Sequence, residues 1–210
     1  MKLLVTGFEP FGGESVNPSW EAALALPDRM GAAEVVRRRL PVVFGECGDA
    51  VAAAMREERP DAVVCLGQAG GRSQLTPEFV GIDWRAARIP DNAGVQPEGE
   101  RILPDGPDAY FSTLPVGAMA AACVGAGVPA AVSYTAGTFC CNEVLYRALR
   151  TAEQELPGCR CCFVHVPYLP EQVAASGKAQ PSMPLATIVR GLTAMLDGTL
   201  APGETVPFSD

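Results

Sequence analysis

The most informative shortage in this sequence is histidine, because the chain of 210 residues contains only His165. A single imidazole excludes the H-E-x-x-H, His-rich and Cys2His2 metal sites, each of which needs two or more histidines. A zinc ion would have to be held by thiols, but Cys161 and Cys162 are adjacent on a predicted strand and face opposite sides of it. We therefore expect no metal site.

Long apolar runs and an excess of basic residues are also missing. No stretch approaches the roughly 20 apolar residues of a membrane-spanning helix, and the apolar run at the start is too short for a signal peptide. We expect a cytoplasmic protein with no membrane partner. The formal net charge is -8, from 16 Lys and Arg against 24 Asp and Glu. Because nucleic-acid backbones are bound by clustered Lys and Arg, we expect no nucleic-acid partner.

Nucleotide-binding signatures are absent as well. The glycine-rich loop 7–13, GFEPFGG, does not have the G-x-G-x-x-G spacing, and no Gly-Lys-Ser/Thr follows it. The loop instead carries two aromatic residues, Phe8 and Phe11, beside a proline. Such a pair can form the wall of an apolar pocket.

What the sequence does contain is enough apolar material for a core. Hydrophobic residues make up 48% of the chain, which predicts a single domain over residues 1–210. Eight cysteines in a chain of this size do not indicate a small disulfide scaffold, so we expect mostly free thiols.

Apolar runs alternate with segments of helical spacing along most of the chain. This order is typical of an α/β fold, and it predicts one three-layer α/β/α domain around an open, mostly parallel twisted sheet. We expect an irregular stretch at 96–106, a mobile loop at 171–184 and a frayed tail from residue 199. The predicted strands are 2–6, 35–43, 61–67 and 161–168, and the predicted helices are 17–26, 46–58, 116–124 and 184–196.

The stretch 130–150 is central to the functional interpretation. A β-branched run ends in a turn at 136–138, and a segment of helical spacing follows, which places Cys140 and Cys141 where a strand meets a helix. Free N–H groups at a helix N-terminus favour negative charge and lower the pKa of a thiol there. The alternative is that both thiols are buried structural residues.

A lone histidine on a strand of the same sheet allows a second hypothesis. A cysteine, a histidine base and an orienting carboxylate form the general arrangement of a thiol nucleophile, although His165 could equally be a core residue. Arg88 either pairs with a nearby aspartate or stabilises an oxyanion. Spacing leaves four candidates for the orienting acid: Glu78, Asp83, Asp91 and Glu171.

Seven motifs occur in order between about residues 3 and 172: TGFEPFGG, NPSWEA, LGQAGGR, LTPE, ARIPDNAG, SYTAGTFCCN and VHVPYLPEQ. With these motifs the chain resembles the pyroglutamyl peptidase I (pyrrolidone carboxyl peptidase) family of cysteine peptidases. The resemblance implies removal of N-terminal L-pyroglutamate from peptides without a cofactor, by a homo-oligomer that is often a tetramer.

The resemblance also implies roles for individual residues. Cys141, before Asn in the GTFCCN motif, is the implied nucleophile, His165 the base and Glu78 the third member of the triad. Arg88 and the backbone N–H of Cys141 form the oxyanion hole. Phe8 and Phe11 would sandwich the lactam ring. The remaining implied pocket residues are Asn17, Gln68, Ile89, Phe139 and Cys140.

The chain departs from the family pattern just after Glu78, where Phe79 replaces an arginine and Asp83 adds an acid that could alter the environment of Glu78. Two other functions stay open. One is a thiol amidohydrolase of different acyl specificity on the same scaffold, and the other is a thiol-rich binding protein without catalysis.

Overall fold

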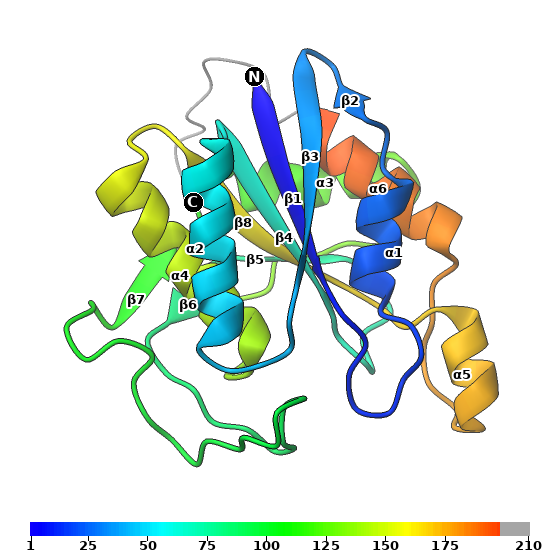
Figure 1. Ribbon diagram of the computed structural model, residues 1–210. Helices are drawn as coiled ribbons and strands as arrows, with labels where there is room; N and C mark the ends of the chain where they lie inside the picture. Colours follow the sequence, from blue (N-terminus) through cyan, green and yellow to red (C-terminus); the bar gives the residue numbers. More distant parts are fainter. Residues whose placement is uncertain (198–210) are drawn as a thin grey trace.

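A twisted six-stranded sheet runs through the middle of the molecule, with helices on both faces (Figure 1). The computed structural model describes residues 1–197. The strand order is β2-β3-β1-β4-β8-β5, in which β3, β1, β4 and β8 are parallel and the two edge strands are antiparallel to their neighbours. The predicted α/β class with a mostly parallel sheet is confirmed. The strands are β1 Lys2–Phe8, β2 Arg29–Met30, β3 Ala33–Leu40, β4 Ala62–Gln68, β5 Thr76–Glu78, β6 Val80–Ile82, β7 Ala109–Phe111 and β8 Arg160–Val166.

Two helical layers cover the sheet. Helices α2 and α4 pack on one face, while α1, α3 and α6 pack on the other; α5 lies beside the loop that follows β1 (Figure 1). A separate two-stranded sheet of β6 and β7 contacts α4. The helices are α1 Pro18–Ala25, α2 Glu46–Glu58, α3 Val116–Gly125, α4 Cys140–Glu155, α5 Pro170–Ser176 and α6 Leu185–Asp197.

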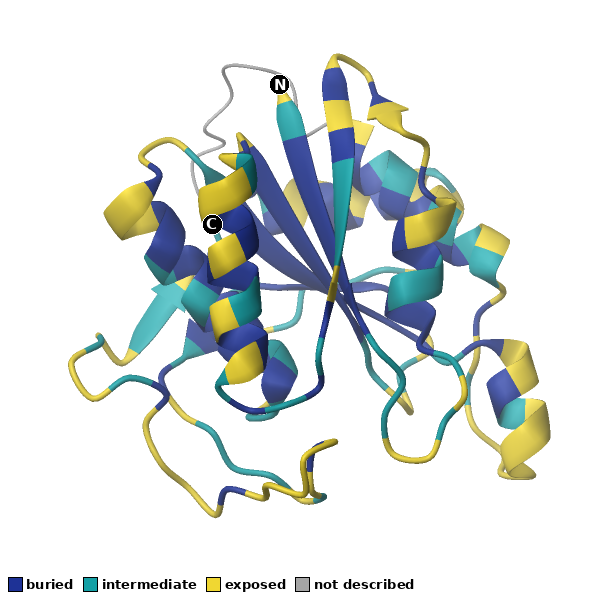
Figure 2. Cartoon of the chain, in the orientation of Figure 1, coloured by how far each residue is buried: buried dark blue, intermediate teal, exposed yellow. Residues whose placement is uncertain are grey.

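The central strands are buried on both faces, which explains their nearly continuous apolar sequences (Figure 2). Side chains alternate between the layers, so that Leu3 belongs to the core under α1, α3 and α6 and Leu4 to the core under α2 and α4. Cys161 and Cys162 divide in the same way, as their adjacent positions predict.

The segment before α4 differs from its prediction as a strand. Residues 129–133 run parallel to β5, but their pairing with it is limited to isolated bridges at Ala130 and Ser133. Leu75 donates to the carbonyl of Pro129 and Phe79 to that of Ser133, whereas Pro77, midway between these donors, has no N–H. The missing donor interrupts what would otherwise be a continuous ladder.

The mobile loop predicted at 171–184 is wrong in its first part, because residues Pro170–Ser176 form α5. Pro170 occupies the first helical turn, where a missing N–H costs nothing. The Gln172 side chain accepts a hydrogen bond from the N–H of Leu169 at 2.9 Å and so caps the helix, and Gly177 ends it in the left-handed conformation. The predicted frayed tail lies outside the described residues.

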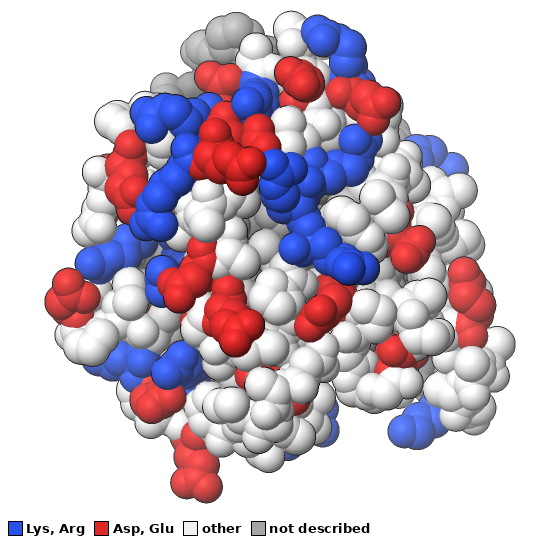
Figure 3. Space-filling model, in the orientation of Figure 1, with Lys and Arg blue, Asp and Glu red and all other residues white. Residues whose placement is uncertain are grey.

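Surface charge is mixed rather than concentrated. On the face shown in Figure 3, basic and acidic side chains are interspersed. Many of the charged groups are paired, as Arg38 is with both Glu57 and Glu58. Within residues 1–197, none of the helices combines the length and apolar character needed to cross a membrane.

Candidate active site

A cavity of about 440 Å³ opens at the carboxyl ends of three neighbouring strands, β1, β4 and β8. This is the edge at which open α/β sheets bind ligands. Three loops meet there, since residues of loop 7–13, of the stretch after β4 and of the turn before α4 all contribute to the wall. The lining residues are Phe8, Phe11, Asn17, Val42, Gln68, Ala69, Gly70, Arg72, Arg88, Thr135, Ala136, Gly137, Thr138, Phe139, Cys140, Cys141 and His165.

Strand pairing brings His165 and Glu78 together. In the antiparallel pair of β5 and β8, Thr76 lies opposite His165, so Glu78 is its diagonal neighbour on the same face. The Nδ1 atom of His165 is 2.6 Å from Oε1 of Glu78. Both side chains are buried, at 4% and 0% exposure. Of the four candidate acids, only Glu78 is in contact with the imidazole among the described residues.

This contact determines the protonation of the imidazole. A carboxylate only accepts hydrogen bonds, so Nδ1 of His165 carries the proton and Nε2 keeps a free lone pair. Burial lowers the pKa of His165, against the opposing effect of Glu78. Burial raises the pKa of Glu78, but His165, Ser133 and Arg72 outweigh it and the pKa ends below its ordinary value. The resting pair is therefore a neutral imidazole beside an ionised carboxylate.

Cys141 lies at the second position of α4, after Phe139 as the N-cap. A Cβ atom added to Gly67 would lie 2.8 Å from the Cys141 sulfur. Gly67 is the register partner of His165 in the parallel pair of β4 and β8. The glycine therefore leaves the space in which the sulfur sits, next to the histidine on the neighbouring strand, and both side chains line the cavity.

The expected lowering of the thiol pKa at this helix N-terminus is wrong. Although Cys141 is partly exposed to the cavity, desolvation raises its pKa well above the ordinary value, and Cys47 and Glu78 raise it further. Arg72 and the N–H of Cys141 itself act in the opposite direction but do not prevail. At rest the Cys141 side chain is therefore a thiol, because surrounding protein atoms disfavour the thiolate more than one helix end favours it.

Arg88 is exposed, lines the cavity and forms no ion pair within residues 1–197. The two aspartates considered as its partners are occupied elsewhere. Asp91 accepts backbone N–H groups, including that of Phe44 at 2.8 Å, and Asp83 pairs with Arg101 at 2.7 Å. The guanidinium is therefore available to a ligand.

Arg72 is the residue of the site that sequence reasoning missed. Its Nη1 atom donates to Oε1 of Glu78 at 2.7 Å and also to the hydroxyl of Thr76, and Nη2 donates to the carbonyl of Thr135 at 3.4 Å. It thus links the carboxylate behind His165 to the turn before α4. The LGQAGGR motif ends at Arg72, but nothing in its spacing identifies Glu78 as the partner.

The sequence model of one family, pyroglutamyl peptidase, matches residues 1–201. The chain belongs to the pyroglutamyl peptidase family. Its members are cysteine peptidases. The pyrrolidone-carboxylate peptidase of Streptomyces coelicolor is 55% identical over 196 residues, which cover 93% of this chain and 90% of that protein. The pyrrolidone-carboxylate peptidase of Levilactobacillus brevis is 50% identical, with 93% and 96% covered.

Solved structures of the pyroglutamyl peptidase family share this fold. Pyroglutamyl peptidase I of Bacillus amyloliquefaciens superposes with a TM-score of 0.90 at 45% identity, covering 94% of this chain and 96% of that one. A pyrrolidone carboxyl peptidase of Pyrococcus furiosus, determined together with a cysteine-free mutant, gives a TM-score of 0.91 at 38% identity, covering 95% and 98%.

The predicted pocket residues differ in what they contribute. Phe8 is buried at 2% exposure, while Phe11 packs against Phe139 with ring centroids 6.1 Å apart. Asn17 lines the cavity, but its side chain also caps α1 and donates to the carbonyl of Glu9. Ile89 is not among the lining residues, whereas its neighbour Arg88 is.

The departures from the pyroglutamyl peptidase pattern leave the Glu78 carboxylate undisturbed. Asp83 is held by Arg101 and by the N–H of Leu103 at 2.8 Å. The ring of Phe79 packs against Phe111, with centroids 5.1 Å apart. Neither residue is among the causes of the pKa shift of Glu78.

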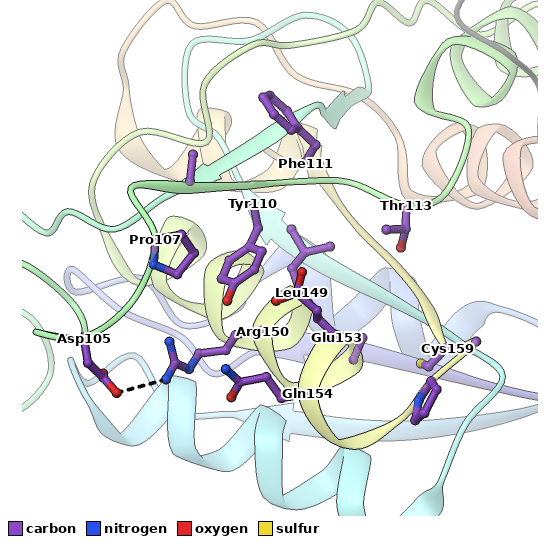
Figure 4. Close-up of a pocket in the computed structure, with 14 residues that line it drawn as sticks. Asp105, Pro107, Tyr110, Phe111, Thr113, Leu149, Arg150, Glu153, Gln154 and Cys159 are labelled. Carbon is purple, nitrogen blue, oxygen red and sulfur yellow. Dashed lines mark hydrogen bonds and ion pairs between the residues drawn. The ribbon is translucent and has the colours of Figure 1, made fainter.

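A larger cavity of about 900 Å³ lies elsewhere, between β7 and the second half of α4 (Figure 4). Its charged groups are partly paired, as in the contact of Arg150 with Asp105 at 3.3 Å, and it contains one thiol, Cys159. No histidine lines it. In this member of the pyroglutamyl peptidase family, the smaller cavity therefore holds the groups capable of nucleophilic catalysis.

Proposed function

We propose that the protein is a cysteine exopeptidase that removes N-terminal L-pyroglutamate from peptides, with Cys141, His165 and Glu78 as its triad. The observation that carries the proposal is the buried Nδ1–Oε1 contact of 2.6 Å behind a cavity lined by both His165 and Cys141. Family membership supports the substrate class, since the curated relatives are pyrrolidone-carboxylate peptidases. We place the activity in the cytoplasm, where thiols stay reduced, and in a homo-oligomer, as the resemblance implies.

The proposed reaction begins with transfer of the Cys141 thiol proton to Nε2 of His165 as the sulfur attacks the pyroglutamyl carbonyl carbon. The N–H of Cys141 and the guanidinium of Arg88 stabilise the resulting oxyanion. Collapse of the tetrahedral intermediate breaks the C–N bond, and the imidazolium gives its proton to the leaving amine. Water, deprotonated by His165, then attacks the thioester and releases pyroglutamate and the thiol.

The raised pKa of Cys141 makes the proton transfer concerted with attack in this mechanism. A neutral thiol and a neutral imidazole avoid the cost of a resting ion pair in a poorly solvated site. Glu78 stabilises the imidazolium only when it forms.

The walls of the cavity suit a lactam ring. Pyroglutamate presents a flat, neutral, mostly apolar five-membered ring with one N–H and one C=O. Phe8, Phe11 and Phe139 provide aromatic surface, and Gln68 provides a polar group. A free, charged N-terminus would lose its hydration in the same space, which disfavours ordinary peptides.

Release of p-nitroaniline from L-pyroglutamyl-p-nitroanilide under reducing conditions tests the proposal. We expect turnover by the native chain, a loss of kcat of at least about 10³-fold in Cys141→Ser, and near-native kcat in Cys159→Ser, which replaces a thiol outside this cavity. A Cys141→Ser variant at native rate would refute the assignment. Turnover of L-prolyl-p-nitroanilide with none of the pyroglutamyl substrate would favour a thiol amidohydrolase of different specificity.

A further inference from the structure

Gln172 is a buried glutamine whose amide can take only one orientation. Its Oε1 accepts the N–H of Leu169 at 2.9 Å. Its Nε2 faces the carboxylate of Glu14 at 3.3 Å and the carbonyl of Val16 at 3.4 Å. A backbone N–H can only donate, whereas a carboxylate and a carbonyl can only accept. Turning the amide over would oppose like groups at all three contacts.

This fixed amide in turn fixes Gln68. Nε2 of Gln172 also donates to Oε1 of Gln68 at 3.0 Å. The carbonyl oxygen of Gln68 is therefore engaged, and a flip would place its NH2 group against the NH2 group of Gln172. Gln68 is the last residue of β4 and lines the cavity, while Gln172 does not. The Gln68 group left for a ligand is thus a hydrogen-bond donor.

We propose that Gln172 is a positioning residue that holds Gln68 as a donor and so makes the cavity selective for ligands with a carbonyl acceptor. The inference rests on the proposed function for its natural ligand, where that acceptor is the lactam carbonyl of the pyroglutamyl ring. The N–H of Leu169 fixes the orientation of the Gln172 amide, and the Gln172 amide fixes that of Gln68. The NH2 group of Gln68 is thereby left for the cavity. A site that presents a donor rejects analogues without the matching acceptor, since its polar group is left unpaired.

Three small ligands test the donor directly: 2-pyrrolidinone, cyclopentanone, which keeps the carbonyl, and methylenecyclopentane, which keeps the shape but has no acceptor. Their binding is measured as protection of Cys141 from alkylation by iodoacetamide, followed by mass spectrometry. In the native chain we expect cyclopentanone to protect at about tenfold lower concentration than methylenecyclopentane, the effect of about one hydrogen bond.

Variants of Gln172 then test the positioning role. In Gln172→Leu we expect the tenfold preference for cyclopentanone over methylenecyclopentane to fall to within about twofold. For the pyroglutamyl anilide, KM should rise about tenfold while kcat changes less than about threefold. In Gln172→Glu the introduced carboxylate still accepts from Leu169 but must also accept from Gln68, which turns the Gln68 carbonyl to the cavity. We expect cyclopentanone, which has only an acceptor, to bind more weakly there than in Gln172→Leu.

The matched control is Ser176→Ala, which removes a hydrogen bond from the other end of α5. It should keep the native ligand preference; an equal loss in this variant would show that disturbing α5 alone is sufficient and would overturn the proposal. A preference that is absent in the native chain, or unchanged in both Gln172 variants, would also overturn it.

If the Gln172 variants do not fold, Gln68→Glu tests the donor group on which the proposal depends. Gln172 can still donate to one oxygen of the introduced carboxylate, which leaves only an acceptor for the cavity. Loss of the carbonyl preference in this variant supports the proposal, and an unchanged preference overturns it. Failure of the native chain to cleave the pyroglutamyl anilide would reject the proposed function, whereas the ligand preferences would still decide the role of Gln172.

Discussion

A single oxygen atom, Oε1 of Glu78, receives hydrogen bonds from both His165 and Arg72. Because Arg72 and His165 both donate to this atom, only a hydrogen-bond acceptor can occupy the place of Oε1. The arrangement differs from a histidine–carboxylate pair alone, because a second donor independently fixes which atom faces the imidazole.

Replacement of Glu78 by glutamine tests this arrangement. The amide oxygen of Glu78→Gln should take the place of Oε1 between the two donors, which preserves the proton on Nδ1 and removes only the negative charge. Loss of a charge-assisted bond costs about 1.5–3 kcal/mol, so we expect kcat to fall about 10- to 100-fold. Glu78→Ala, which removes the acceptor, should lose at least tenfold more. Equal kcat values for the two variants would contradict the argument.

Arg72 should also determine the pH dependence. In the proposed mechanism we expect activity to fall as pH decreases through the pKa of His165, because protonation removes the proposed base. Burial is the main cause that lowers this pKa, and Arg72 lowers it further. In Arg72→Gln the pKa of His165 should rise, and the acid limb of kcat/KM should move to higher pH. Arg72→Lys keeps the charge and should keep the limb near its native position.

Arg147→Gln is the control for that measurement. Arg147 also lies on the side of the sheet that carries α4 and pairs with Asp49 at 2.6 Å, but it does not line the cavity. It should leave the acid limb in place. A limb that moves equally in Arg72→Gln, Arg72→Lys and Arg147→Gln would show that loss of any ion pair is sufficient.

Residue types and their place on strands were enough to predict part of the site from the sequence. Cys141 lies at the start of a helix and His165 on a neighbouring strand, as expected. The partners Arg72 and Gln172 could not be predicted, because each acts through a side chain that tertiary packing places beside it. The pKa of Cys141 was predicted in the wrong direction because sequence shows a helix end but not desolvation.

At the scale of elements, the packing of β4 requires a residue without a side chain at Gly67. An added Cβ would lie 2.5 Å from Cζ of Phe163 and 2.8 Å from the sulfur of Cys141, and Phe163 is confined by the core. We expect Gly67→Ala to lower the free energy of unfolding by about 1–3 kcal/mol and to reduce kcat, measured by urea unfolding and turnover. In Gly117→Ala, within α3, a Cβ meets nothing within 4 Å. That variant should be stabilised by up to about 1 kcal/mol, with unchanged kcat.

Elements with a strong local signal were the predictable ones. Helix α2 coincides with the predicted range 46–58, since its apolar spacing and acidic first turn act locally. Two features escaped prediction. The cap of α5 is a local contact, but the N-cap residue is Leu169, which gives no capping signal in the sequence. The bridges of residues 129–133 to β5 join segments distant in sequence, and their pattern depends on the position of Pro77.

At the scale of the whole molecule, the thiols are unevenly distributed. Those on the α2 and α4 side of the sheet are Cys47, Cys65, Cys140, Cys141, Cys159 and Cys161, and those on the other side are Cys123 and Cys162. All eight are free thiols, where the sequence predicted that most would be. Only Cys141 and Cys159 are partly exposed, so access to solvent rather than number decides which of them react.

Alkylation of the native protein at pH 7 should therefore modify two thiols and, after unfolding, eight. Cys159 should react first, because a hydrogen bond with Cys161 lowers its pKa whereas burial raises that of Cys141. Peptide mapping at successive times measures both rates. Inactivation should follow modification of Cys141 and not that of Cys159. Loss of activity in step with Cys159 labelling would contradict the assignment of the nucleophile.

Because the chain contains a single imidazole, its NMR signals report on the site directly. Since the chain contains one histidine and its ring is 4% exposed beside Glu78, ring nitrogen resonances in an NMR spectrum of the native chain need no assignment by mutagenesis. Ligand entry, tautomer exchange and protonation can then all be followed at the proposed catalytic centre through one pair of signals.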